Sequence, residues 1–148
     1  KSCRQNPMSR ALRVDKLTYA ALEATLLSFI EGKAKTEIPV LRMLALSKMA
    51  IEQRAENLIA SINTKASIEI SIADGTSRVG GGAAADSLLP TSVITISKDA
   101  TTPDELILAL RNHHPPVIAR ISEDQVLIDL RTVEPSEDYQ IKEALESL

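Results

Sequence analysis

The first third of the chain carries apolar residues at helical spacing. Asp15 suits a helix N-cap and Gly32 suits a helix end. Between them, apolar side chains recur every three or four positions, at Tyr19, Leu22, Leu26, Phe29 and Ile30. A second stripe begins at Pro39 and continues to about Asn63, with Leu44, Ile51, Ala55, Leu58, Ile59 and Ile62. The pattern predicts two N-terminal helices.

After Lys65 the spacing of apolar residues changes from helical to alternating. Ile68, Ile70 and Ile72 alternate with polar residues, and Asp74-Gly75 has the chemistry of a tight turn. Residues 92–97 are rich in β-branched side chains, which favour a second strand. The glycines at positions 80–82 are expected between these two strands.

The last third of the chain combines helix and strand signals. Thr102-Pro103-Asp104-Glu105 has the pattern of a capping box, so a short amphipathic helix is expected to follow. Residues 117–121 and 125–133 are predicted to form a hairpin, and residues 136–148 a closing helix. This order predicts an α+β fold, in which a small antiparallel sheet carries helices on one face.

Composition limits the architecture further. A length of 148 residues suits a single domain, and only 2% of the residues are aromatic, so we expect an aliphatic core. Residues 1–14 are set apart as a basic lead-in segment. There is no long apolar run or signal peptide, which favours the cytoplasm, and the lone Cys3 excludes an internal disulfide. The chain does not begin with Met, so we expect a piece of a longer protein.

Basic residues are concentrated at the start of the chain. Residues 1–16 hold five basic residues against Asp15, a net charge of +4, which leaves −7 for the remainder. If this stretch is helical, Arg10 and Arg13 share one face and could bind a phosphate-like anion. The alternative is a pair of surface arginines in salt bridges.

Two other patterns are weaker. Gly80-x-Gly82-x-x-Ala85 resembles a dinucleotide-binding pattern, but the residues after it do not begin a helix, so we reject that interpretation. Gly80, Gly81 and Gly82 then form either a loop near a bound substrate or a simple strand connection. His113 and His114 are adjacent and lack further ligands at helical spacing, so no metal site is predicted.

Several motifs resemble those of one family in order along the chain. Residues 10–26, beginning Arg10-Ala11-Leu12-Arg13, closely resemble the R-A-L-R-V-D-K-L-T-x-A-A-L-E-A-T-L segment of bacterial selenocysteine synthases, the L-seryl-tRNA(Sec) selenium transferases. Residues 38–44 resemble that family's I-P-x-L-R-x-L, residues 79–82 its glycine loop, and residues 116–121 with 127–132 its closing hairpin. The resemblance covers nearly the whole chain.

The resemblance implies the C-terminal portion of a fold-type-I enzyme that depends on pyridoxal 5'-phosphate. The family replaces the hydroxyl of seryl-tRNA(Sec) with selenium from selenophosphate, works as a ring of dimers and takes up tRNA through a small N-terminal domain. Carried over by position, Arg10 and Arg13 would bind the phosphate-like end of the selenium donor. One departure is the stretch after Gly82, which is longer than the family's pattern.

The same resemblance places the cofactor's lysine upstream of this chain. Lys16 lies in an Asp-Lys-Leu sequence, but no Gly-Gly-Pro-Gln follows it, so no Schiff-base role is assigned to it. The chain is therefore expected to contain no catalytic residue and to be inactive alone. Two alternatives stay open: a related fold-type-I lyase acting on a small amino acid, or a stand-alone interaction or oligomerisation module.

Overall fold

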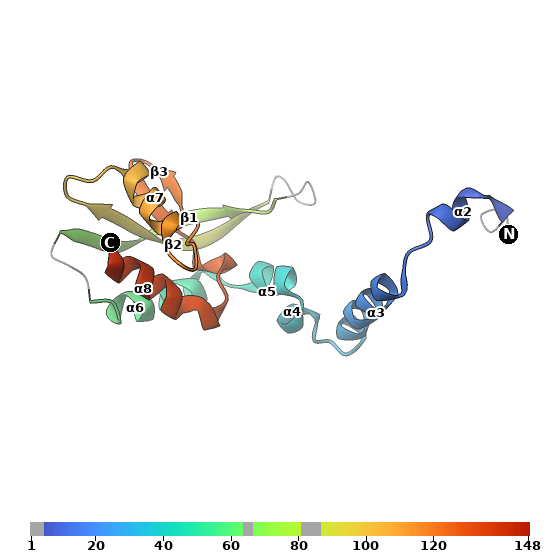
Figure 1. The fold of residues 1–148 in the computed structure, drawn as a ribbon. Helices are drawn as coiled ribbons and strands as arrows, with labels where there is room; N and C mark the ends of the chain where they lie inside the picture. Colours follow the sequence, from blue (N-terminus) through green and yellow to red (C-terminus); the bar gives the residue numbers. More distant parts are fainter. Residues whose placement is uncertain (1–4, 64–66, 81–86) are drawn as a thin grey trace. The chain divides into compact units, whose positions relative to one another are not determined.

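The computed structural model describes residues 5–63, 67–80 and 87–148 of the chain (Figure 1). It divides into two compact units, Lys1–Ala45 and Leu46–Leu148, and each is described separately below. Whether the two units act as the single domain expected from the sequence stays a prediction.

The first unit is helical over its described residues, 5–45. Its described helices are α2 (Met8–Ala11), α3 (Lys16–Ile30), α4 (Ala34–Glu37) and α5 (Pro39–Ala45). Helix α3 begins where the sequence predicts, because the Asp15 side chain accepts a hydrogen bond from the Thr18 backbone N–H at 2.8 Å. It ends just before Gly32, which has a φ of +73° that glycine adopts without strain.

The apolar stripe of α3 is exposed within this unit. Tyr19, Leu22, Leu26, Phe29 and Ile30 are each more than half exposed, and α3 has no buried residue. Among the described residues up to Ala45, only Ala34 is buried. The helix is therefore specified by its own caps and pattern rather than by packing inside the unit.

The single second helix predicted from Pro39 to about Asn63 is wrong. The chain forms α5 and then a separate helix, α6 (Lys48–Ala60). The cause is Ser47, whose backbone is extended and whose hydroxyl accepts a hydrogen bond from the Ala50 N–H at 3.2 Å. Serine is a favoured N-cap, so it starts a new helix inside an otherwise continuous apolar pattern.

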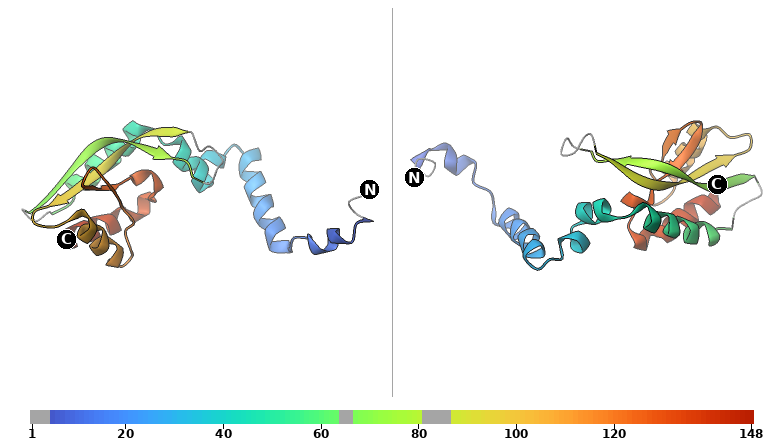
Figure 2. Two further views of the ribbon diagram at one scale, coloured as in Figure 1. Left: turned by 90° about the horizontal axis from the view of Figure 1, so that it is seen from above. Right: turned by 180° about the vertical axis from the view of Figure 1, so that it is seen from behind.

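The second unit is built on a four-stranded antiparallel sheet of order β1-β2-β4-β3 (Figure 2). The strands are β1 (Ile68–Arg78), β2 (Leu88–Lys98), β3 (Arg120–Ser122) and β4 (Gln125–Ile128). The tight hairpin β3–β4 is confirmed, and its turn residues Glu123 and Asp124 both have positive φ, as this kind of turn requires. The strand predicted to run on to residue 133 ends at Ile128, and Leu130–Thr132 forms a 3₁₀ turn, η1.

The turn predicted at Asp74-Gly75 is also wrong. Strand β1 continues through both residues, and Gly75 pairs with Thr91 of β2. A Cβ at Gly75 would lie 3.1 Å from Cγ1 of Val93, so the glycine allows close packing across the sheet. Here a turn-like dipeptide instead marks a position where a neighbouring side chain packs closely against the backbone.

In the described part of this unit, three helices cover one face of the sheet, which confirms the predicted α+β class. They are α6, α7 (Pro103–Asn112) and α8 (Asp138–Ser147), the last preceded by a 3₁₀ turn, η2 (Pro135–Glu137). Strand register places Ile72, Ile94 and Ile128 side by side, with Ile70, Ile96 and Val126 in the next row. These rows join one aliphatic core with Ile51, Leu58, Leu106, Leu110, Ile141 and Leu145 from the helices. The capping box expected at Thr102 and Glu105 is present.

A partly buried arginine joins three elements of this unit. Arg54 in α6 donates to both carboxylate oxygens of Asp138 in α8, at 2.8 and 2.5 Å. It also donates to the carbonyls of Leu130 and Val133, each at 3.0 Å. This fixes the segment after β4, which carries part of the cavity described next.

Candidate functional site

The two arginines singled out from the sequence lie in the first unit. Arg10 is in α2, but this helix ends at Ala11, so Arg13 lies outside it and the argument for a shared helical face does not apply. Both side chains are exposed. Arg13 lines an open pocket of about 830 Å³ together with Asn6, Met8, Ser9, Leu12, Val14 and Tyr19. Anion binding by Arg10 and Arg13 stays a prediction.

The carboxylate nearest to them in sequence is already engaged. Asp15 accepts hydrogen bonds from the N–H of Thr18 at 2.8 Å and from its hydroxyl at 3.0 Å. The backbone hydrogen bond from Thr18, followed by its hydroxyl, lowers the pKa of Asp15. Within the described part of the chain, no carboxylate forms an ion pair with Arg10 or Arg13. Their charge is therefore available to an external anion.

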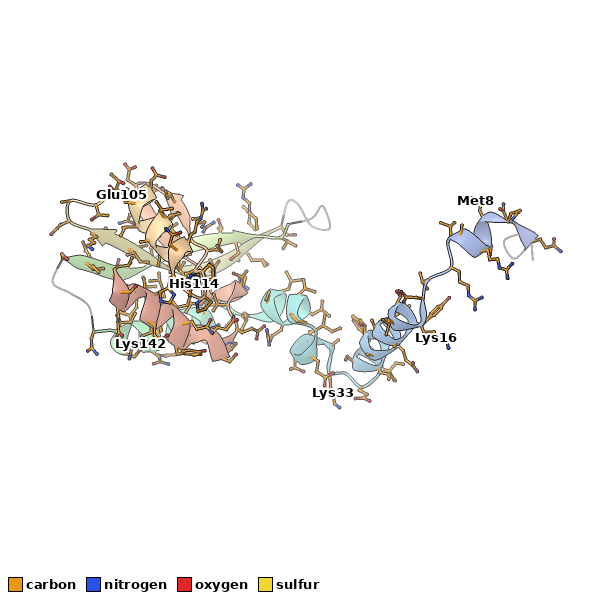
Figure 3. All side chains as sticks on the ribbon, in the orientation of Figure 1. Met8, Lys16, Lys33, Glu105, His114 and Lys142 are labelled. Carbon is orange, nitrogen blue, oxygen red and sulfur yellow. The ribbon has the colours of Figure 1, made fainter. Side chains whose placement is uncertain are left out.

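The described lysines do not fit a Schiff-base site for pyridoxal phosphate. Lys16 is exposed in the first turn of α3 (Figure 3). Lys48 pairs with Asp74 at 2.6 Å, and this hydrogen bond raises the pKa of Lys48, whereas a reactive lysine needs a lowered one. Lys98 donates to the Leu148 carbonyl. None of the lysines at positions 16, 33, 35, 48, 98 and 142 is buried.

Of the predicted glycine loop, only Gly80 is described. Gly81 and Gly82 lie outside the described residues. Gly80 follows the end of β1, and none of the described residues lies within 4 Å of where its Cβ would be. Packing against the described part of the chain therefore does not require glycine at position 80.

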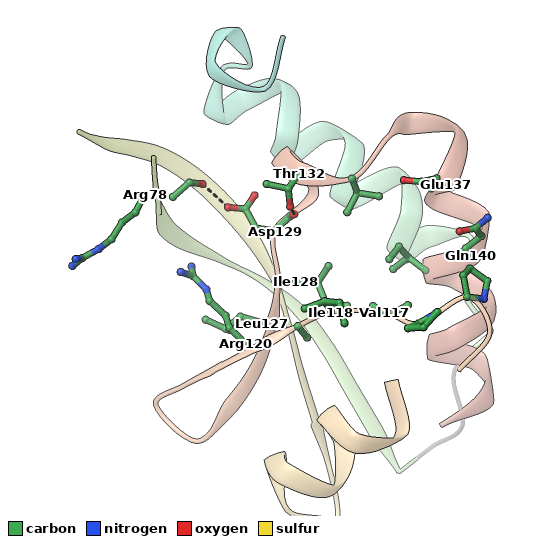
Figure 4. A pocket seen from close by; sticks show the side chains of 16 residues that line it. Arg78, Val117, Ile118, Arg120, Leu127, Ile128, Asp129, Thr132, Glu137 and Gln140 are labelled. Atoms are coloured by element: carbon green, nitrogen blue, oxygen red, sulfur yellow. Dashed lines mark hydrogen bonds between the residues drawn. The ribbon is translucent and has the colours of Figure 1, made fainter. Parts of the chain in front are cut away.

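The second unit contains a cavity of about 490 Å³ that sequence reasoning did not identify (Figure 4). It lies where β1 ends and β4 passes into η1. Its walls include Ser77, Arg78, Pro115–Arg120, Leu127–Asp129, Thr132, Val133, Glu137, Gln140 and Ile141. The available signal was the presence of Arg120 and Asp129 on the two strands of the hairpin predicted at 117–121 and 125–133, but only the sheet brings Arg78 to the same cavity.

A buried polar network closes one side of this cavity. Asp129 accepts hydrogen bonds from the hydroxyls of Ser77 and Thr91, at 2.5 and 3.0 Å. Arg131 is only 4% exposed and donates to the Ser77 hydroxyl at 3.2 Å. It also donates to the carbonyls of Leu46 and Pro90, at 2.8 and 2.7 Å. Asp129 and Arg131 thus have a structural role, because they form hydrogen bonds with the polar groups around them.

The remaining histidine prediction concerns metals. His113 Nδ1 lies 3.0 Å from the carbonyl oxygen of Pro115. Across residues 5–63, 67–80 and 87–148, no three His, Cys, Asp or Glu side chains are grouped to hold a metal ion. Over the same ranges, none of the helices has the length and apolar character needed to cross a membrane.

Known proteins match this chain along most of its length. The family described as L-seryl-tRNA selenium transferase (SelA) matches residues 1–134. The L-seryl-tRNA(Sec) selenium transferase of Carboxydothermus hydrogenoformans is 40% identical over 144 residues, covering 97% of this chain and 31% of that protein. That of Aquifex aeolicus is 39% identical over 145 residues, covering 98% of this chain and 32% of that protein.

A further relative also matches, and in all three relatives the match covers only part of the protein's length. The L-seryl-tRNA(Sec) selenium transferase of Alkaliphilus oremlandii is 41% identical over 140 residues, which is 93% of this chain and 30% of that protein. The chain thus spans about a third of the length of these relatives. The resemblance noted from the motifs is confirmed, and the chain belongs to the L-seryl-tRNA selenium transferase family.

Proposed function

We propose that this chain is the C-terminal portion of an L-seryl-tRNA(Sec) selenium transferase, which converts seryl-tRNA(Sec) to selenocysteinyl-tRNA(Sec) with selenophosphate. The observation that carries the proposal is the family match over residues 1–134, together with relatives that bear this name. Within that reaction, this chain supplies Arg10 and Arg13 to bind the phosphate-like end of the selenium donor.

The local chemistry supports an anion-binding role for these arginines. Guanidinium groups bind tetrahedral oxyanions through paired, charge-assisted hydrogen bonds. Asp15, the carboxylate closest in sequence, is held by Thr18 and does not neutralise them. Electrostatic attraction in a short basic segment would bring the anionic donor to this part of the enzyme.

The cofactor belongs to another part of the protein in this proposal. The resemblance implies pyridoxal phosphate and places its lysine upstream of this chain, and each described lysine is exposed or paired, which supports this placement. The chain alone is then inactive. The working form is a cytoplasmic homo-oligomer, and the exposed apolar face of α3 suits burial against the rest of the protein.

A chimaeric enzyme tests this proposal. The matching segment of the Carboxydothermus hydrogenoformans relative is replaced by this chain, and transfer of labelled selenium from selenophosphate to seryl-tRNA(Sec) is measured. We expect activity in the chimaera and a loss of about tenfold to a hundredfold in its Arg10→Ala and Arg13→Ala variants. Arg111→Ala, an exposed arginine of α7, is the matched control.

Two results would reject the proposal. A folded chimaera without selenium transfer, beside an active unmodified relative, would mean that this chain does not serve as the equivalent segment. Elimination of a small amino acid without transfer to tRNA would favour the related lyase instead.

A second candidate function is assembly of subunits. The observation that favours it is the stripe on α3, since Leu22, Leu26 and Phe29 are each about half exposed. If the chain associates with itself in analytical ultracentrifugation and Leu26→Glu abolishes this association, an oligomerisation role gains support. A monomer at all concentrations would contradict it.

A further inference from the structure

Two exposed arginines from opposite edges of the sheet line the same cavity. Arg78 is the last residue of β1, and Arg120 is the first residue of β3, at the two edges of the order β1-β2-β4-β3. Both line the cavity, and Figure 4 shows their side chains on the same side of it. Arg120 Nη2 donates to the carbonyl of Thr76 at 3.4 Å, which holds it beside the end of β1.

Their positive charge is not neutralised by the acidic groups around them. Among the described residues, no carboxylate forms an ion pair with Arg78 or Arg120. Asp129 already accepts hydrogen bonds from Ser77, Thr91 and the Arg131 N–H. Glu137 accepts from the Glu134 N–H at 3.2 Å and lies across the cavity from both arginines (Figure 4).

This charge stands out because the unit is acidic. Residues 46–148 contain nine Lys and Arg against sixteen Asp and Glu, a net charge of −7. Two guanidinium groups that form no ion pair with a described carboxylate are not part of a general basic coat on such a surface. They mark a local site for an anion.

Apolar side chains line the cavity beside the arginines, and part of this apolar surface is exposed. Ile118 is 73% exposed, and Pro116 and Leu127 also line the cavity. A small anion needs only hydrogen-bond donors, whereas a nucleotide chain also presents sugar and base surfaces that pack on apolar groups. The combination suits a phosphodiester within a longer strand better than a free anion.

We propose that Arg78 and Arg120 bind backbone phosphates of RNA at this cavity. The inference rests on the proposed function, because the relatives' names specify a tRNA substrate. Contacts of this kind position a nucleic acid and carry no base sequence information. This RNA-binding role is distinct from the donor-binding role proposed for Arg10 and Arg13.

The test is binding of a fluorescently labelled RNA hairpin to the 148-residue chain, followed by anisotropy over a range of salt concentrations. We expect Arg78→Ala and Arg120→Ala each to raise the Kd by about threefold to tenfold and to reduce the salt slope by about one. The double variant should lose about two units of slope, and Arg111→Ala should leave both quantities unchanged. Repeating the series in a background of Lys1→Ala, Arg4→Ala, Arg10→Ala and Arg13→Ala removes the contribution of the basic lead-in segment.

Competitors separate the possible sources of the anion. Unlabelled RNA should displace the hairpin, whereas inorganic phosphate and polyglutamate at equal ionic strength should not. Equal competition by phosphate or polyglutamate would overturn the assignment to RNA, as would wild-type affinity and slope in the double variant. Because anisotropy requires no reaction, failure of this inference is distinguishable from failure of selenium transfer in the chimaera.

Discussion

Helix α3 in the first unit and helix α7 in the second begin in the same way but have different surroundings. Asp15 caps α3, and Thr102 with Glu105 caps α7. However, α3 buries no residue, while α7 buries Leu106, Ile107 and Leu110 against the sheet. Local sequence signals therefore define where a helix starts, but they do not tell whether its apolar face is covered within the unit.

The largest expected difference between the two helices is the cost of removing a leucine. Leu110→Ala deletes a side chain that is 1% exposed, so the free energy of unfolding should fall by about 2–5 kcal/mol. Leu26→Ala in α3, at 51% exposure, should change it by about 0.5 kcal/mol or less. Urea denaturation of both variants measures this contrast, and equal losses would mean that α3 is covered in solution.

The buried polar network is the next most sensitive feature. Arg131→Ala leaves the carbonyls of Leu46 and Pro90 without their donors, so we expect a loss of about 3 kcal/mol in unfolding free energy. Arg111→Ala, on the exposed side of α7, should cost about 0.5 kcal/mol or less. Comparable denaturation midpoints for the two variants would show that the network does not stabilise the sheet.

Removing a helix N-cap should have a smaller effect on stability, and we expect this effect to differ between the two units. Thr102→Ala removes the N-cap of α7 and should lower the unfolding free energy by about 1 kcal/mol. Asp15→Ala should reduce the far-ultraviolet helical signal of α3 and leave the urea midpoint of the second unit unchanged. If Asp15→Ala shifted that midpoint, the stability of the second unit would depend on α3, contrary to this expectation.

The smallest effect is a dependence of stability on pH. Hydrogen bonds from the Thr102 N–H and hydroxyl lower the pKa of Glu105 below its ordinary value of 4.5. Because this pKa is lower in the folded state, the ionised Glu105 carboxylate contributes its full stabilisation above pH 4.5. This contribution is lost as the pH falls through the pKa of the folded state. Glu105→Gln should flatten this part of the stability profile. An unchanged slope in acid denaturation would argue against the capping box.

Binding of an apolar dye would test directly whether the apolar face of α3 is exposed. We expect an apolar dye to bind the chain at the face of α3 formed by Leu22, Leu26 and Phe29. Phe29→Glu should remove most of the fluorescence, whereas Leu108→Glu, an exposed residue of α7, should not. If the unmodified chain gives no dye fluorescence, this face is covered in solution, for example by self-association.

The sequence by itself determined the features that depend on neighbouring residues. The caps at Asp15 and Thr102, the alternation at Ile68, Ile70 and Ile72, and the turn after Ser122 were all predictable, because each depends on residues a few positions apart. The aliphatic core and the α+β class followed from the same patterns. The family followed from motifs and not from physical reasoning.

Only the tertiary structure decided the features that depend on distant residues. Gly75 faces Val93 inside a strand instead of forming a turn. The Ser47 cap is a local signal by contrast, and it was missed because the apolar stripe runs on through it. The cavity joins Arg78 to Arg120, more than forty positions apart, through strands that pair in an order no local pattern reveals. Side-chain contacts across a sheet depend on register and strand order, and these are set by packing of the whole unit.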